Sequence, residues 1–168
     1  MLWAWELIGD VFWCREVTTI QRGTWDDHDE ALARAFDRYH VVDPESGQRK
    51  SKIVRVSVDQ NGMGEKPVFD WQKKYGNRIE GVMFNLQSKH HLANIIKKIF
   101  ESHQARIPQG DRHLINDLHK LKRIVTPAGN ARFDADRDVN GHADRFWSAA
   151  LGLYAADRPV MCKPLFGH

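Results

Sequence analysis

The chain has 168 residues and a mass of 19.4 kDa, which is the size of one domain with a substantial core. Lysine and arginine total 25, aspartate and glutamate total 22, and the resulting formal charge of +3 does not by itself indicate nucleic-acid binding. Cys14 and Cys162 lack a second cysteine at metal-ligand spacing, and we find no secretory leader or long apolar span. The composition argues against a disulfide scaffold, a structural zinc site and a membrane-spanning protein, and it predicts a soluble protein of a reducing compartment.

The first part of the chain predicts a β-hairpin followed by a helix. Residues 1–8 and 11–20 are rich in aromatic and β-branched residues and are separated by a Gly-Asp turn, which is the pattern of two antiparallel strands. Residues 24–39 place apolar side chains at helical spacing, and either Thr24 or Asp26 is suited to cap this helix. Both elements are expected to be scaffold.

A central strand is predicted next. The charged segment 43–52 has the composition of an exposed loop and leads into residues 53–65, which read I-V-R-V-S-V-D-Q-N-G-M-G-E. The alternation of β-branched with polar residues predicts a strand that ends at Asp59, followed by a glycine turn and a helix over 67–75. Because α/β sheets keep their sites at the carboxyl ends of strands, Asp59 is a candidate site residue. The alternative is that Asp59 only caps the turn or the next helix.

The alternation of strand and helix continues after this unit. Residues 78–84 predict a second strand and residues 88–103 an amphipathic helix. Strands linked through helices pair in parallel, so we expect a mixed sheet flanked by helices, an α/β fold. Lys89 lies at the start of the second helix, in a group of basic residues that is typical of a solvated helix face.

A basic hairpin is predicted near the end of the chain. A short helix over 111–121 leads into two short strands around a Pro-Gly-Asn turn, and these strands carry Lys122, Arg123 and Arg132. A β-hairpin with positive side chains can lie along a DNA groove and contact phosphates, whereas the alternative is ordinary surface charge.

The last predicted helix lies in the stretch 141–156, which starts G-H-A-D-R-F-W-S-A-A-L, and the helix begins at Asp144. Its small residues allow close packing against a sheet. Such packing would bring Asp144 beside Asp59, and two neighbouring carboxylates need a cation or a shared proton. The alternative is that Asp144 only interacts favourably with the helix dipole. His142 is placed to orient a carboxylate or to touch DNA.

The V-D-Q-N-G-M-G-E strand end and the late G-H-A-D-R-F-W-S-A-A-L helix resemble the second and third acidic motifs of the nuclease domain of phage terminase large subunits, especially the Mu-like type. The resemblance covers residues 1–158 and leaves 159–168 as a tail. It implies a ribonuclease H-like fold in which Asp59 and Asp144 are catalytic and bind two Mg²⁺ or Mn²⁺ ions. It also implies that Lys89, in an F-x-x-x-x-K context, contacts phosphate.

In that family an earlier strand carries the first acid, and an ATPase motor precedes the nuclease domain. We find neither in this sequence, so we expect a domain that lacks its first strand and cleaves poorly alone. The implied function is metal-dependent endonucleolytic cleavage of double-stranded DNA during genome packaging in the bacterial host cytoplasm. The implied partners are DNA, other terminase subunits and the portal, without a membrane. The alternatives are a non-catalytic prophage remnant, a DNA-binding or assembly module of the same fold, and another ribonuclease H-like nuclease such as a junction resolvase.

Overall fold

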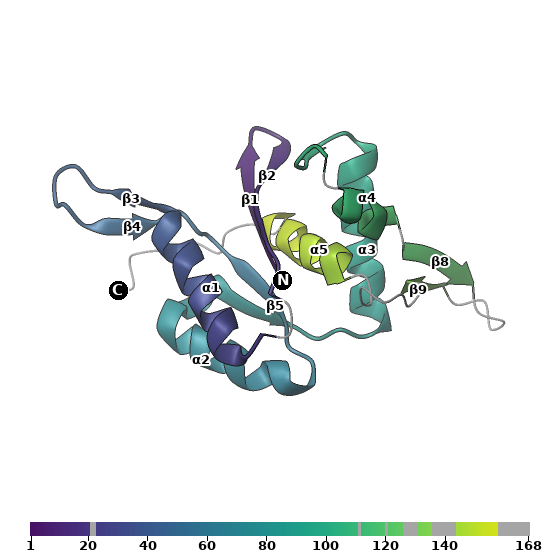
Figure 1. Ribbon diagram of the computed structural model, residues 1–168, viewed down its shortest axis with the longest axis horizontal. Helices are drawn as coiled ribbons and strands as arrows, with labels where there is room; N and C mark the ends of the chain where they lie inside the picture. Colours follow the sequence, from purple (N-terminus) through teal and green to yellow (C-terminus); the bar gives the residue numbers. More distant parts are fainter. Residues whose placement is uncertain (21–22, 111, 120, 126–130, 136–143, 158–168) are drawn as a thin grey trace, which may run out of the picture.

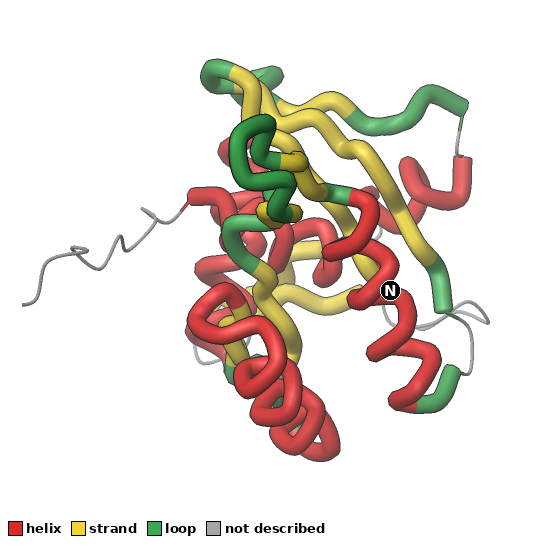
Figure 2. The backbone as a smooth tube through the Cα atoms, turned by 90° about the vertical axis from the view of Figure 1, so that its left-hand side faces the viewer, coloured by secondary structure: helices red, strands yellow, loops and turns green. Residues whose placement is uncertain are grey.

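The computed structural model describes residues 1–20, 23–110, 112–119, 121–125, 131–135 and 144–157 (Figure 1). The strands are β1 (Leu2–Ile8), β2 (Val11–Thr18), β3 (His40–Val42), β4 (Arg49–Ser51), β5 (Val56–Asp59), β6 (Ile79–Val82), β7 (Ala105–Arg106), β8 (Leu121–Val125) and β9 (Ala131–Ala135). The α-helices are α1 (Trp25–Arg38), α2 (Glu65–Tyr75), α3 (Leu86–Glu101), α4 (Arg112–His119) and α5 (Asp144–Asp157). Helices lie on both sides of the strands (Figure 2), so the α/β class predicted from the sequence is confirmed.

The opening hairpin has the predicted form. β1 and β2 pair antiparallel, and the turn between them uses Gly9 at φ 63°, a conformation that glycine adopts without steric cost. β7 extends this sheet in parallel on the far side of β2, giving the order β1-β2-β7. The sequence did not predict β7, because two residues are too few to show a period.

The helix α1 also agrees with its prediction. Thr24, rather than Asp26, is the N-cap: its hydroxyl accepts from the Asp27 backbone N–H at 3.3 Å, while the Asp27 carboxylate accepts from the Thr24 N–H at 2.6 Å. This reciprocal arrangement satisfies two N–H groups near the start of the helix.

Two boundaries differ from the expectation. The segment 43–52, predicted as a loop, instead contributes β4 to a hairpin with β3, with Val41 opposite Lys50. These three-residue strands are largely charged or exposed, so they carry none of the alternation that marks a half-buried strand. The central strand β5 begins at Val56 rather than at residue 53.

The second sheet is the parallel pair β5-β6, as predicted, with Asp59 opposite Val82. One face of β5 buries Val56 and Val58 against a core that includes Leu32 of α1 and Val68 of α2. A second core joins α3 and α5 to β1 and β2, and its most buried members are Leu92, Ala149, Ala150 and Leu153.

The hairpin β8-β9 was also predicted, and its register places Lys122 opposite Asp134 and Ile124 opposite Arg132. Figure 1 shows it projecting from the side of the molecule that carries α3 and α5. None of the helices in the described part of the chain has both the length and the apolar character needed to span a bilayer.

Candidate active site

Asp59 is the last residue of β5, and its side chain is exposed. One carboxylate oxygen accepts a hydrogen bond from the Asn61 backbone N–H at 3.0 Å, so Asp59 does stabilise the turn. The chain then folds back closely: a Cβ added to Gly64 would lie 2.5 Å from the Asp59 carbonyl oxygen, which only glycine avoids. The tight turn leaves the Asp59 side chain at the carboxyl end of the strand.

Asp144 is the first residue of α5 and is exposed as well. It lies near the amine of Met1, whose pKa is lowered by burial while the negative charge of Asp144 opposes that shift. One turn further along the helix, the Ser148 hydroxyl donates to the Met1 carbonyl at 3.4 Å. These contacts hold the start of α5 against the start of β1.

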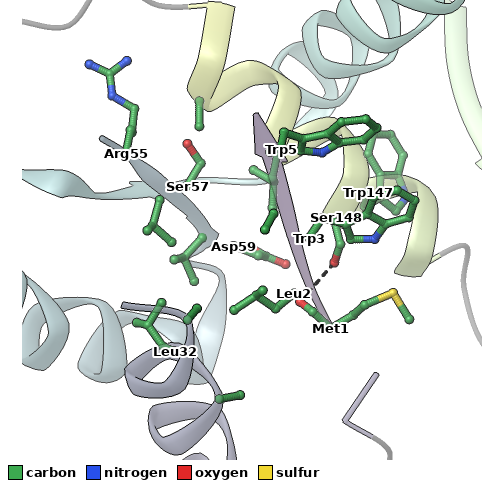
Figure 3. Close-up of a pocket in the computed structure, with 18 of the residues that line it drawn as sticks. Met1, Leu2, Trp3, Trp5, Leu32, Arg55, Ser57, Asp59, Trp147 and Ser148 are labelled. Atoms are coloured by element: carbon green, nitrogen blue, oxygen red, sulfur yellow. Dashed lines mark hydrogen bonds between the residues drawn. The ribbon is translucent and has the colours of Figure 1, made fainter. Parts of the chain in front are cut away.

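Both carboxylates line one cavity of about 2240 Å³. Figure 3 shows the Asp59 side chain pointing toward the first residues of β1, the same residues that Asp144 and Ser148 approach. Two acids that are 85 positions apart in the sequence (144 minus 59) therefore line the same cavity.

Lys89 lines the same cavity and is held over two aromatic rings. Its ammonium lies 5.8 Å from the ring centroid of Phe84 and 5.5 Å from that of Trp147. The attraction between a cation and the ring faces favours this position. Lys89, predicted by resemblance alone, thus lines the same cavity as both acids, and the two aromatic residues are functional candidates that the sequence reasoning missed.

A largely buried ion pair lies at the N-terminal end of α5. The Arg145 guanidinium donates to the Asp117 carboxylate at 3.1 Å, and the two side chains are only 22% and 12% exposed. Both residues line the cavity, so the pair connects α4 to the residue that follows Asp144. Removing one partner would leave a poorly hydrated charge behind.

For the remaining predicted DNA contacts, the structure describes the backbone only or nothing at all. Lys122, Arg123 and Arg132 lie on the paired strands β8 and β9, but their side chains are outside the described part of the structure. His142 lies outside the described residues altogether.

Cys14, the cysteine in the described part of the chain, does not line the cavity. Burial raises the pKa of the Cys14 thiol to about 11, with a weak opposing hydrogen bond to the Glu16 carbonyl. A thiol that stays protonated at neutral pH is a poor nucleophile and a poor metal ligand.

The described residues supply part of the ligand set that the implied metal needs. Within the described ranges, no group of three or more acidic, histidine or cysteine side chains is arranged to hold a metal ion. Asp59 and Asp144 do supply two carboxylates to one cavity, and Mg²⁺ is commonly held by one or two carboxylates together with waters and substrate phosphates. The two acids fit the protein's share of one such ion, whereas a two-ion site needs a further ligand.

Comparisons with known proteins identify the family and the fold of the chain. The family model described as the terminase RNaseH-like domain matches residues 1–155. The solved nuclease domain of the Thermus phage P74-26 large terminase is similar, with a TM-score of 0.58 and 18% identity over 79% of this chain and 60% of that one. The large terminase nuclease of the thermophilic phage G20c, solved with bound magnesium, gives 0.58 and 20% over 79% and 62%.

This chain therefore spans only about three fifths of the solved domains that it matches. No curated protein sequence matches it. The likeness supports the ribonuclease H-like fold expected from the two acidic motifs.

Proposed function

Since the chain belongs to the terminase RNaseH-like domain family, we propose that it is the nuclease portion of a phage terminase large subunit and cuts DNA endonucleolytically during genome packaging. The observation that supports this proposal is that Asp59, at the carboxyl end of β5, and Asp144, at the start of α5, both line one cavity. Two carboxylates from distant segments, with a lysine beside them, suit a phosphodiester whose negative charge must be held near a cation.

Each of these side chains has a distinct task in the proposed reaction. A divalent ion, Mg²⁺ or Mn²⁺, would be held by Asp59 and Asp144 and would supply activated water and stabilisation of the leaving oxygen. Lys89 binds a non-bridging phosphate oxygen from its place over Phe84 and Trp147. Arg145, fixed by Asp117, keeps the first turn of α5 in place.

We further propose double-stranded DNA as the substrate, with Lys122, Arg123, Arg132 and His142 contacting its backbone. Other terminase subunits and the portal are the proposed assembly partners, and the bacterial host cytoplasm is the proposed location. The solved relative with bound magnesium supports the choice of metal. Residues 1–158 form the proposed nuclease-like unit.

The proposed domain lacks one strand, and a gap between the two sheets supports this. β1 and β5 each pair along one edge only, and among the described residues no strand lies on the other edge of either. Every residue of β1 from Leu2 to Leu7 and every residue of β5 from Val56 to Asp59 lines the cavity. Side chains alternate between the two faces of a strand, so an unbroken run of lining residues means that the backbone edges form the walls.

Helices close this gap on both faces. α5 contributes Leu151, Gly152 and Ala155, while α1 contributes Ala31 and Leu32. The volume of about 2240 Å³ exceeds the roughly 300–1,000 Å³ of ordinary ligand pockets. The cavity is bounded by the edges of two strands and by two helices. An additional strand would fit in this position.

A non-catalytic module of the same fold is the second candidate. The described residues offer two carboxylates and no third ligand for a metal pair, which favours weak metal binding. Such a module would bind DNA without cutting it.

Cleavage of supercoiled plasmid with Mg²⁺ or Mn²⁺ tests the proposal. Any metal-dependent nicking by the purified chain should be lost in Asp59→Asn and in Asp144→Asn, because each removes a charged oxygen ligand. Asp70→Asn is the matched control, since Asp70 is exposed on α2 and does not line the cavity. Nicking that survives both active-site changes would contradict the assignment. DNA binding without nicking at any metal concentration would favour the non-catalytic module.

A further inference from the structure

The turn after β5 contains an asparagine whose side chain substitutes for backbone pairing. Asp59 lies opposite Val82, and the Gln60 N–H still donates to the Val82 carbonyl at 3.0 Å. In the same register Asn61 stands opposite Phe84, where the chain leaves the strand for the glycine turn. The Asn61 amide completes the pairing: its Oδ1 accepts from the Phe84 N–H at 2.6 Å, and its Nδ2 donates to the Phe84 carbonyl at 2.8 Å.

Phe84 in turn determines where α3 begins. Asn85 is the N-cap of this helix, and its side chain accepts from the Ser88 N–H at 2.8 Å. The Ser88 hydroxyl also donates to the Met83 carbonyl at 2.7 Å, so the residues on both sides of Phe84 are fixed. Lys89 follows in the first turn, with its N–H donating to the Asn85 carbonyl at 3.0 Å.

A short chain of contacts therefore runs from the first acid to the lysine. Asp59 accepts from the Asn61 N–H, Asn61 holds both backbone groups of Phe84, and the Phe84 ring lies under the Lys89 ammonium. All of these residues line the same cavity. Hydrogen bonds with two partners on one residue fix orientation as well as distance.

We propose that Asn61 is a positioning residue, which holds Phe84 and thereby sets where the Lys89 ammonium lies relative to Asp59. Lys89 then binds the phosphate next to the acidic pair. The inference rests on the proposed function for the identity of the ligand, duplex DNA. The simpler alternative is that Asn61 only satisfies two backbone groups of a turn, in which case its loss would affect stability and not Lys89.

A double-mutant cycle separates these possibilities. Binding of a duplex DNA oligonucleotide is measured over a range of salt concentrations, without divalent metal, for the parent chain, Asn61→Ala, Lys89→Ala and the double variant. Lys89→Ala should weaken binding several-fold and reduce the salt slope by about one, since one phosphate contact is lost. Asn61→Ala should reproduce most of that change, and the double variant should bind no more weakly than Lys89→Ala, because residues that act as a unit are not additive.

Two further variants sharpen the result. Asn61→Asp keeps the acceptor for the Phe84 N–H and loses the donor to the Phe84 carbonyl, so its effect should be intermediate. Asn94→Ala is the control. Asn94 is an exposed asparagine of α3, and its side chain is hydrogen-bonded to His90 of the same helix. It should leave the salt slope unchanged.

Additive effects of Asn61→Ala and Lys89→Ala would overturn the proposal. So would an Asn61→Ala variant that melts at a lower temperature but keeps the parent salt slope. If Asn61→Ala does not fold, the cycle is run with Asn61→Asp. Coupling between the two residues without any DNA cleavage would support this inference and contradict the proposed nuclease activity. Cleavage without coupling would support the nuclease activity and contradict this inference.

Discussion

At the scale of single residues, the two acids serve the fold and the site together. Asp59 accepts a hydrogen bond from the turn that follows it, and Asp144 stands at the first position of α5. Capping the turn and standing at the start of a helix, the local roles considered for Asp59 and Asp144, are thus compatible with the proposed metal binding. What the sequence alone could not predict is the Asn61 contact, because it depends on a register between segments 23 positions apart.

A partly buried histidine of α1, His28, gives a prediction of pH dependence. Burial lowers the pKa of His28 below its ordinary 6.5, the Met1 amine adds to the shift, and Asp27 opposes it. Because the folded pKa is the lower one, the unfolded chain takes up the proton first. The stabilisation is complete above pH 6.5 and is lost as the pH falls through the folded pKa.

Urea unfolding between pH 7.5 and 5 should therefore show a falling midpoint, and His28→Gln should flatten this fall. His90→Gln is a suitable control, because His90 lies on α3 and, unlike His28, does not line the cavity. A parent midpoint that stays constant over this range would contradict the role given to His28.

At the scale of elements, local patterns predicted those that are long and amphipathic. The opening hairpin, α1, α3 and α5 each show a period over many residues, and all are found close to the predicted bounds. β3, β4 and β7 are two or three residues long and were missed, because their pairing depends on partners elsewhere in the chain.

The contact between α5 and β1 leads to a stability prediction with an unusual sign. Replacing glycine by alanine inside a helix ordinarily stabilises by up to about 1 kcal/mol. A Cβ on Gly152 would lie 2.5 Å from Trp5 Cδ1, on a ring that stacks against Trp3 at 5.3 Å. We expect Gly152→Ala to destabilise by about 1–3 kcal/mol instead, because the packed rings must shift.

Urea unfolding measures this change in the free energy of unfolding. Replacing Trp5 by leucine in the same chain should reduce the cost of Gly152→Ala, since the colliding ring is removed. A Gly152→Ala variant that is as stable as the parent would show that the helix can move away from the strand at little cost.

At the scale of the whole molecule, β1 and β5 line one cavity, and among the described residues no strand pairs with the edge of either that faces away from its partner. β5 ends where β1 begins, so the two strands run in opposite directions (Figures 1 and 3). A strand between them would be parallel to β5 and antiparallel to β1, and would end beside Met1, where a tight turn suffices to enter β1. With helices on both faces, its side chains would be apolar in both directions.

The free edges also predict how the isolated chain behaves. Among the described residues no strand pairs with the outer edge of β1 or of β5, and an open strand edge favours pairing with other molecules, so the chain should self-associate and cleave DNA weakly. We expect an upstream extension of about seven residues, the length of β1, that carries an aspartate and a two-residue turn to restore solubility and cleavage together. The same extension with asparagine in place of its aspartate should restore solubility only, and one with two prolines should restore neither, because proline cannot donate to the neighbouring strand. Light scattering and plasmid nicking measure the two effects. Robust metal-dependent nicking by the unextended chain, abolished by Asp59→Ala and by Asp144→Ala, would show that the existing acids suffice.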